Sequence, residues 1–371
     1  GDCNEVAKLA QRDVVHVYRP IWSEKRLAIE KYYHQKSFSF YFYVADADYS
    51  SSPSRTRLCE GAHPIKFFEE KRMTQAIAKP SGRARQSTDI RLRCPRASGE
   101  NRPAKLIYEH YRIERALADR LRNAPKKGRA ALYREVYDEL FERVPQHQQL
   151  TLSVVPDDER IELERQFNFL KRFLQASDHL LEVGTGDGAL SRLASKHCTR
   201  VTAVDVSEMP QNDDPLPEGM TFRLLPDGQL PQDLDIDVAY SNQLMEHLHP
   251  DDAKEQLEAI CRSLKPGGRY VCITPNAVSG PWDISMYFDE RPTGLHLREY
   301  RVQELVDLMK SAGFKDVRCY AGGRGKFARV PKFAIQLMET GLSLLPYRLR
   351  SIVSRTLPVR GFLGLRLVAW K

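Results

Sequence analysis

The chain has 371 residues, of which 42% are hydrophobic, so it is long enough for one full domain with an attachment. It contains no run of about 18 apolar residues that could span a membrane, and its first residues lack a basic-then-apolar leader pattern. Its seven cysteines are scattered without a C-x-x-C pair, which argues against a disulfide scaffold and a cysteine zinc site. We therefore expect a protein of the cytoplasm.

The first hundred residues differ in composition from the rest. Residues 1–129 carry +12 of charge (27 Lys and Arg against 15 Asp and Glu), which leaves −4 for the remainder (30 against 34). Apolar and aromatic runs at 13–19 and 38–44 predict two strands, whereas from about residue 50 Ser, Arg and Pro interrupt any regular period. We predict a short α/β-like segment of unknown role at 1–49, a basic linker or fusion remnant at 50–104, and the main domain at 105–371. Few aromatic residues accompany the basic ones, so the linker gives no strong nucleic-acid signal.

Three helices are predicted next, at 107–121, 129–144 and 157–174. In the third, apolar residues recur at helical spacing, so one face should pack on a sheet. The first two carry aromatic side chains that fit either the core or a lid over a cleft, namely Tyr108, Tyr111, Tyr133, Tyr137 and Phe141. We assign residues 105–175 to a helical lid.

The most informative segment is residues 181–188, Leu-Glu-Val-Gly-Thr-Gly-Asp-Gly, followed by a strand-like run that ends at Asp205. Glycines at the end of a buried strand let the chain turn sharply and bring backbone N–H groups close to a ligand. A carboxylate at the end of the next strand can accept both hydroxyl groups of a ribose. The pattern predicts a nucleoside-cofactor site.

The spacing of the glycines distinguishes between two cofactors. An NAD fingerprint reads G-x-G-x-x-G around a pyrophosphate, whereas this chain reads G-x-G-x-G and places Glu182 just before the first glycine. A carboxylate at that point would repel a pyrophosphate and attract a cation. The sequence favours cationic S-adenosylmethionine, and an NAD-dependent oxidoreductase is the rival class.

With three later segments, this motif resembles the class I S-adenosylmethionine-dependent methyltransferase family over about residues 108–371. Segments 235–242, 264–276 and 224–228 are similar to the family's fourth strand, its Pro-Gly-Gly turn with the fifth strand, and the end of its third strand. The resemblance implies an α/β fold: a seven-stranded, mostly parallel Rossmann-like sheet with helices on both faces, and a catalytic core at 176–330. It assigns the methionyl part of the cofactor to Glu182, Gly184, Gly186 and Gly188, the ribose to Asp205, the adenine to Asp227 and Gly228, and the side facing the methyl donor to Asn242.

The catalytic chemistry is expected just after the fourth strand, at Glu246 and His247, with His296 as a further candidate. A histidine with the ordinary pKa of about 6.5 can remove a hydroxyl proton at neutral pH, so His247 is our first choice of base. Alternatively, the pair braces the loop, or all three residues hold a divalent cation, as in a metal-assisted branch of the family with an E-x-x-E-H segment. Gln243 replaces the first acid of that segment, and an amide is a poorer ligand for a hard cation. We therefore expect no bound metal.

Segment 277–293 combines rings and charges, which fits a polar, ring-shaped acceptor better than a lipid tail. We predict O-methylation of a small polar or sugar-like acceptor in glycan or secondary metabolism. The alternatives are metal-assisted methyl transfer to another acceptor, including RNA ends, and a cofactor-binding protein without turnover. A basic, amphipathic insertion at 331–360 precedes a closing strand at 363–370. Its residues 331–355 could contact an anionic membrane, pack on the domain, or pack on a second subunit.

Overall fold

The structure is a computed structural model that describes residues 90–97, 100–147, 156–209, 215–226, 228–231, 234–323 and 325–371. The strands predicted at 13–19 and 38–44, and most of the predicted linker, lie outside these residues. None of the helices in the described part of the chain is both long and apolar enough to cross a membrane.

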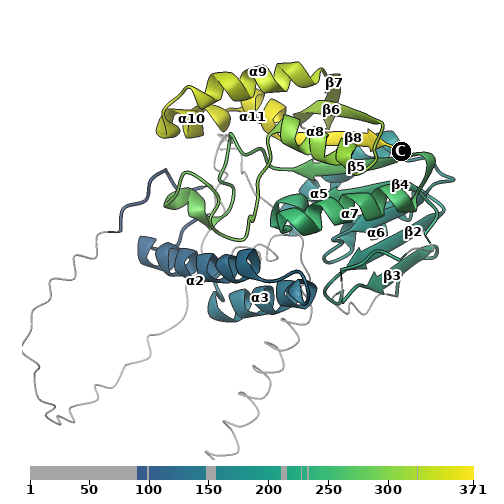
Figure 1. Ribbon diagram of the computed structural model, residues 1–371, viewed down its shortest axis with the longest axis horizontal. Helices are drawn as coiled ribbons and strands as arrows, with labels where there is room; N and C mark the ends of the chain where they lie inside the picture. The colour runs from purple at the N-terminus through teal and green to yellow at the C-terminus, as the bar shows by residue number, and fades with distance from the viewer. Residues whose placement is uncertain are drawn as a thin grey trace, which may run out of the picture.

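A single twisted sheet forms the centre of the described domain (Figure 1). Its strands are β1 (His179–Val183), β2 (Arg200–Asp205), β3 (Met220–Leu224), β4 (Ile236–Asn242), β5 (Leu264–Thr274), β6 (Asp316–Gly323), β7 (Lys326–Val330) and β8 (Leu365–Trp370). They lie in the order β3-β2-β1-β4-β5-β8-β6-β7, with the first five parallel and the last three antiparallel to their neighbours. The predicted Rossmann-like class is therefore confirmed.

The predicted number of seven strands was wrong, because β7 adds an eighth at the edge of the sheet. β7 pairs with β6 in a hairpin, and its residues are exposed or only half-buried on both faces. Edge strands of this kind do not need the alternation of apolar and polar residues that marks a half-buried strand. Residues 326–330 therefore show no regular alternation of apolar and polar side chains from which this strand could be predicted.

Helices cover both faces of the sheet (Figure 1). They are α2 (Ala104–Asn123), α3 (Arg129–Arg143), α5 (Pro156–Leu170), α6 (Ala189–Ala194), α7 (Pro250–Ser263), α8 (Val302–Ser311), α9 (Lys332–Ser343), α10 (Tyr347–Ser354) and α11 (Leu357–Leu363), with short 3₁₀ turns η2 (Lys171–Phe173), η3 (Met245–His247) and η4 (Ile284–Tyr287). The three helices predicted before the glycine motif are confirmed as α2, α3 and α5, the last of which ends in η2. The predicted amphipathic insertion consists of α9, α10 and α11.

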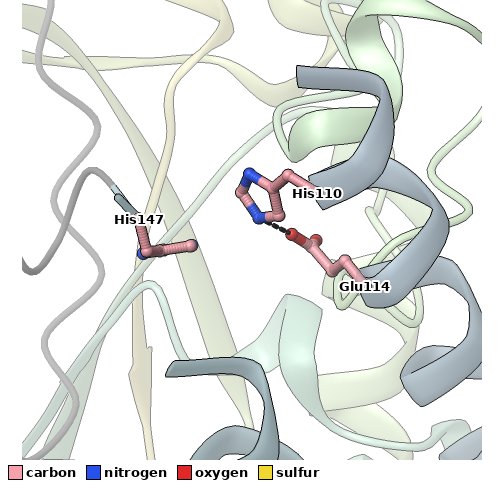
Figure 2. Close-up of side chains that lie close together, drawn as sticks. All are labelled: His110, Glu114 and His147. Atoms are coloured by element: carbon pink, nitrogen blue, oxygen red, sulfur yellow. Dashed lines mark ion pairs between the residues drawn. The ribbon is translucent and has the colours of Figure 1, made fainter. Parts of the chain in front are cut away.

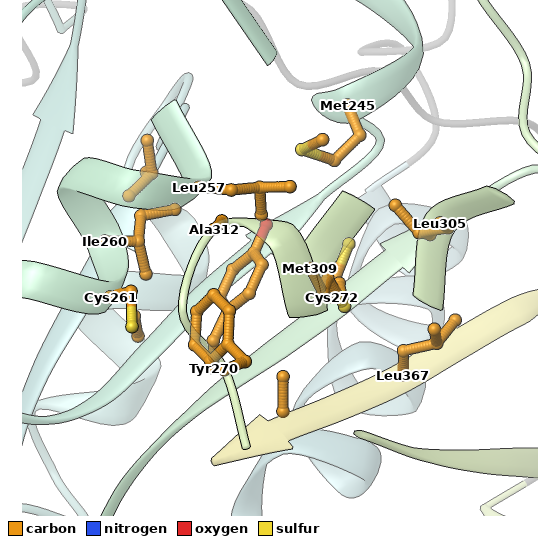
Figure 3. Packing of buried hydrophobic residues seen from close by; sticks show 14 of the residues in the cluster. Met245, Leu257, Ile260, Cys261, Tyr270, Cys272, Leu305, Met309, Ala312 and Leu367 are labelled. Carbon is orange, nitrogen blue, oxygen red and sulfur yellow. The ribbon is translucent and has the colours of Figure 1, made fainter. Parts of the chain in front are cut away.

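Neighbouring residues of the central strands point into two different cores. In β1, Leu180 packs in the core beneath α5 and α6, whereas Leu181 packs in the core beneath α7 and α8. Figure 3 shows the second core, in which Tyr270 lies among side chains of α7 and α8. Because side chains alternate along a strand, a sheet covered on both faces needs unbroken apolar runs. This explains why the parallel strands stand out in the sequence.

The described part of the predicted linker is packed on the domain. The backbone N–H of Arg93 donates to the Tyr287 carbonyl over 2.8 Å, and Cys94 packs with Ile107 and Tyr111 of α2 and with η4. Ala97 N–H donates to the Tyr287 hydroxyl over 3.0 Å. Residues 90–97 thus form a strap across α2 and η4.

Candidate active site

The glycine motif forms the loop between β1 and α6. Gly184, Gly186 and Gly188 have φ values of 73°, 58° and 72°, a left-handed conformation that favours glycine. A Cβ on Gly188 would lie 2.4 Å from Met209 Sδ, and one on Gly184 would lie 3.1 Å from Leu244 Cδ1. The loop needs these glycines both for its turns and for its close packing, as predicted.

Asp205 ends β2 directly beside this loop. Its carboxylate accepts hydrogen bonds from Gly186 N–H over 2.9 Å and from Ser207 N–H over 3.0 Å, and burial raises its pKa to about 6. Each carboxylate oxygen has a second lone pair that can accept a further hydrogen bond. Asp205 can therefore organise the glycine loop and still receive the two hydroxyl groups of a ribose.

Glu182 is buried beneath the same loop. Its Oε2 accepts hydrogen bonds from Thr185 Oγ1 over 3.0 Å and from Ser191 Oγ over 2.5 Å. Burial raises the pKa of Glu182 to about 8, so the side chain holds a proton at neutral pH until a cation approaches. In this arrangement Glu182 ties the loop to the first turn of α6.

A cavity of about 760 Å³ opens at the carboxyl ends of β1, β2 and β4, beneath α3 and beside α7. Four of the predicted cofactor residues line it, namely Gly184, Asp205, Gly228 and Asn242. Glu182, Gly186 and Gly188 lie behind this wall, and Asp227 falls outside the described residues. The cavity thus joins the ends of the strands that the glycine motif identified.

Helix α3 is held over the cavity by contacts with the first turn of α7. Arg129 Nε lies 2.8 Å from Asp252 Oδ2, and the Tyr133 hydroxyl donates to the same oxygen over 2.9 Å. The Tyr133 hydroxyl oxygen in turn accepts from His249 N–H over 2.7 Å. Sequence reasoning did not identify Arg129 and Asp252, because a lone arginine and an acid at a helix start are common surface residues. Tyr133 and Tyr137 of this helix lie in the cavity wall, and its lid role stays a prediction.

His247 projects from η3, just after β4, and lines the cavity. Its Nδ1 lies 3.0 Å from the Leu295 carbonyl and 3.1 Å from the Tyr137 hydroxyl. A carbonyl only accepts, so Nδ1 carries the hydrogen and Nε2 is the basic nitrogen. Burial lowers the pKa of His247 well below its usual value, and the imidazole is therefore neutral at physiological pH.

Glu246 and His296 lie behind His247 and do not line the cavity. Glu246 accepts a hydrogen bond from Thr274 Oγ1 over 2.9 Å, and burial raises its pKa to about 7. His296 Nδ1 lies 2.7 Å from Glu299 Oε1, and the rings of His247 and His296 are 4.7 Å apart. The structure thus brings together the three residues that the sequence singled out.

These three residues also fit a divalent cation. One ligand atom from each of Glu246, His247 and His296 lies within 4.8 Å of the others. Metal-binding histidines usually direct their second nitrogen to a carbonyl or a carboxylate, as His247 does toward Leu295 and His296 toward Glu299. Gln243, in place of the missing acid, has a φ of 53° and lines the cavity. The donor set is consistent with a metal ion, and the expectation of no bound metal stays a prediction.

The expected acceptor segment, residues 277–293, does not line this cavity. Phe288 packs against Tyr111 with ring centroids 4.5 Å apart, and the Tyr111 hydroxyl donates to Asp289 Oδ2 over 2.7 Å. Asp283 caps η4 by accepting from Ser285 N–H over 3.0 Å. The rings and charges of this segment therefore support α2, rather than forming the cavity wall as we expected.

A second group of possible ligands consists of His110 and Glu114 on α2 and of His147, which follows α3 (Figure 2). His110 Nε2 lies 2.9 Å from Glu114 Oε2, but its Nδ1 faces Arg102 Nη1 over 3.1 Å. The guanidinium can only donate, so Nδ1 must accept and Nε2 must carry the hydrogen. This tautomer leaves His110 no lone pair for a metal, and we interpret the group as a structural polar cluster.

Comparisons with known proteins agree with this geometry. A family model described as a methyltransferase domain matches residues 108–318, from α2 into β6. No curated protein matches the chain.

Several solved structures are similar to parts of the chain. They include the Burkholderia thailandensis 1,6-didemethyltoxoflavin-N1-methyltransferase (21% identity, 53% of this chain and 71% of that one, TM-score 0.34). A SAM-dependent methyltransferase from Archaeoglobus fulgidus is 18% identical over 56% of this chain and 91% of that one, with a TM-score of 0.37. A putative methyltransferase in complex with the Haloferax volcanii methyltransferase activator Trm112 is 18% identical over 58% of this chain and 92% of that one, with a TM-score of 0.40.

The family match covers more than half of the chain and contains both the glycine loop and the cavity. It excludes the NAD-dependent oxidoreductase that the glycine motif alone left open. This chain therefore belongs to the methyltransferase domain family and is an S-adenosylmethionine-dependent enzyme.

Proposed function

We propose that this methyltransferase transfers the methyl group to a hydroxyl of a small polar or sugar-like acceptor. The observation that carries the proposal is the position of His247, a neutral imidazole in the wall of the cavity that also contains Gly184, Asp205 and Asn242. A base of this kind is needed for a hydroxyl acceptor, whose proton must leave as the new bond forms.

The proposed reaction is a direct displacement. The acceptor oxygen attacks the methyl carbon, the carbon–sulfur bond breaks, and its electron pair stays on sulfur to give S-adenosylhomocysteine. His247 Nε2 takes the hydroxyl proton, while the hydrogen bond from Nδ1 to Leu295 fixes the ring and supports the imidazolium that forms. Asp205 and the glycine loop hold the cofactor, so that the chain contributes mainly alignment and one proton acceptor.

The remaining wall of the cavity supports a polar acceptor. Beside apolar side chains such as Leu244 and Leu248, it contains hydroxyl, amide and charged groups from α3, α7 and the loop after β4, among them Tyr133, Arg134, Tyr137, Gln243, Glu255 and Gln256. Such groups fix the orientation of an acceptor that carries several hydroxyls. The described cysteines are all free and buried, which supports the cytoplasm as the proposed location.

A second candidate is metal-assisted methyl transfer, supported by the arrangement of Glu246, His247 and His296. A cation bound there would supply Lewis-acid polarisation of an acceptor oxygen. Burial keeps His247 neutral, as a ligand must be, and Glu246 has a pKa of about 7 that a nearby cation would lower. In this case His247 is a ligand and does not receive the proton.

One set of variants separates the two candidates. Under the first, His247→Gln keeps cofactor affinity and loses about a hundredfold to ten-thousandfold in turnover, and high pH restores part of it. Under the second, His247→Gln, His296→Gln and Glu246→Gln each abolish a metal-dependent increment, and a chelator imitates them in the wild type. Turnover is followed as S-adenosylhomocysteine release and affinity by calorimetry.

The matched control is His249→Gln, because His249 lies two residues further along and caps α7 by accepting from Asp251 N–H. It should behave as the wild type. Wild-type turnover in His247→Gln at full cofactor affinity would contradict both candidates.

A further inference from the structure

The surface of α9 and α10 carries an unusual number of uncovered apolar side chains. Of the eight large hydrophobic residues exposed in the described part of the chain, five belong to α9, its C-terminal cap or α10, with exposed fractions between 46% and 81%. They are Phe333, Leu337, Leu344, Leu349 and Ile352. We call this surface the α9–α10 face.

Helical spacing explains why these side chains stay uncovered. Phe333, Leu337 and Leu344 follow one another at intervals of four and seven residues and so share one side of α9. The opposite side is buried, with Ile335 and Leu342 packed in apolar clusters of the domain. The helix thus already has its core contact, and the second apolar side is surplus to folding.

The segment that carries this face is positively charged. Residues 326–363 contain seven basic residues, Lys326, Arg329, Lys332, Arg348, Arg350, Arg355 and Arg360. The same segment contains one acid, Glu339, which is only 3% exposed and accepts hydrogen bonds from Asn276 Nδ2 and Val302 N–H. Outward-facing charge in this segment therefore comes from cations.

We propose that the α9–α10 face docks on an anionic lipid surface, with its apolar side chains in the interface and its cations at the headgroups. A second copy of this chain would bring the same cations face to face. Residues 1–89 are also basic, with 15 Lys and Arg against 11 Asp and Glu, and would be repelled likewise. An anionic membrane is the occupant that complements both the apolar and the charged groups. The proposal is independent of the acceptor and of the base.

The test is co-sedimentation of the full chain with vesicles of phosphatidylcholine alone or of equal parts phosphatidylcholine and phosphatidylglycerol. We expect binding to the anionic vesicles only. The double variant Leu337→Glu, Leu344→Glu should bind at least tenfold more weakly, because it removes apolar contact and adds repulsion. Arg348→Gln should weaken binding about fivefold.

Ile161→Glu is the matched control, because Ile161 is a large apolar residue on a different helix, α5, with 41% of its surface exposed. It should bind vesicles as the wild type does, and all variants should keep their thermal unfolding and their affinity for S-adenosylmethionine. Absence of wild-type binding to anionic vesicles, or undiminished binding by the double variant, overturns the proposal. A third result would also overturn the proposal: the wild type sediments as a dimer and does not bind vesicles, and the double variant sediments as a monomer. That result would assign the face to a second copy of the chain.

Discussion

Replacing Asp205 by alanine tests how the cofactor is held. The change removes a carboxylate that lines the cavity at the end of β2 and accepts from two backbone N–H groups. Loss of hydrogen bonds between the ribose and a charged group costs roughly 1.5 to 3 kcal/mol, which is about tenfold to a hundredfold in affinity. The two N–H groups lose their acceptor as well, so we expect lower thermal stability in addition.

Calorimetry with S-adenosylmethionine measures the affinity, and thermal unfolding without ligand measures the stability separately. Asp235→Ala is the matched control, because Asp235 lies just before β4, at the opposite end of the strands, with 79% of its side chain exposed. It should change neither quantity by much. Unchanged cofactor affinity in Asp205→Ala would remove Asp205 from the site and refute the reasoning.

Three further predictions concern the loop, its glycines and the strap. Cofactor affinity should rise as the pH rises from 7 to about 8, because free Glu182 has a raised pKa of about 8 and must release its proton to stabilise a cation, whereas Asp205, with a pKa of about 6, is already largely ionised. Calorimetry in buffers of different ionisation heat should detect the proton, and Glu182→Gln should abolish most of its release. Gly188→Ala should lower the melting temperature, because its φ of 72° strains any residue with a Cβ and because Met209 must move. Gly341→Ala in α9, with open space around it, should leave the melting temperature unchanged or raise it. A chain that starts at residue 90 should fold and bind the cofactor. A chain that starts at residue 105 should unfold at a lower urea concentration, because it loses the contacts of Cys94. Equal stability of the two chains would show that the strap contributes nothing to stability.

The strands and the cofactor loop could be predicted from the sequence because strong local rules govern them. Strands buried on both faces require unbroken apolar runs, and the positive φ values at Gly184 and Gly188 require glycine. The eighth strand escaped prediction because an exposed edge such as β7 imposes no pattern on its residues.

The candidate site was predicted in part for the same reason. Glu246 and His247 follow β4 directly, so the motif located them, and His296 was a candidate from its place in the chain. The contact between Arg129 and Asp252 joins residues more than a hundred positions apart, and nothing local marks either one. Segment 277–293 was expected to form part of the cavity wall because it mixes aromatic and charged residues. The same mixture occurs in a segment that packs against a helix, so composition alone does not distinguish the two roles.

The strap at residues 90–97 also contacts the helix that carries part of the α9–α10 face. The Arg93 guanidinium lies 5.0 Å from the ring centre of Tyr347 in α10, and Arg355 Nη2 lies 4.0 Å from Cys94 Sγ. The strap itself is therefore held beside α10, a short distance along the chain from Leu349 and Ile352. A domain docked through this face would hold the strap at high local concentration next to the lipid, so that any weak affinity of the strap for the same surface would add to the binding as a second attachment point.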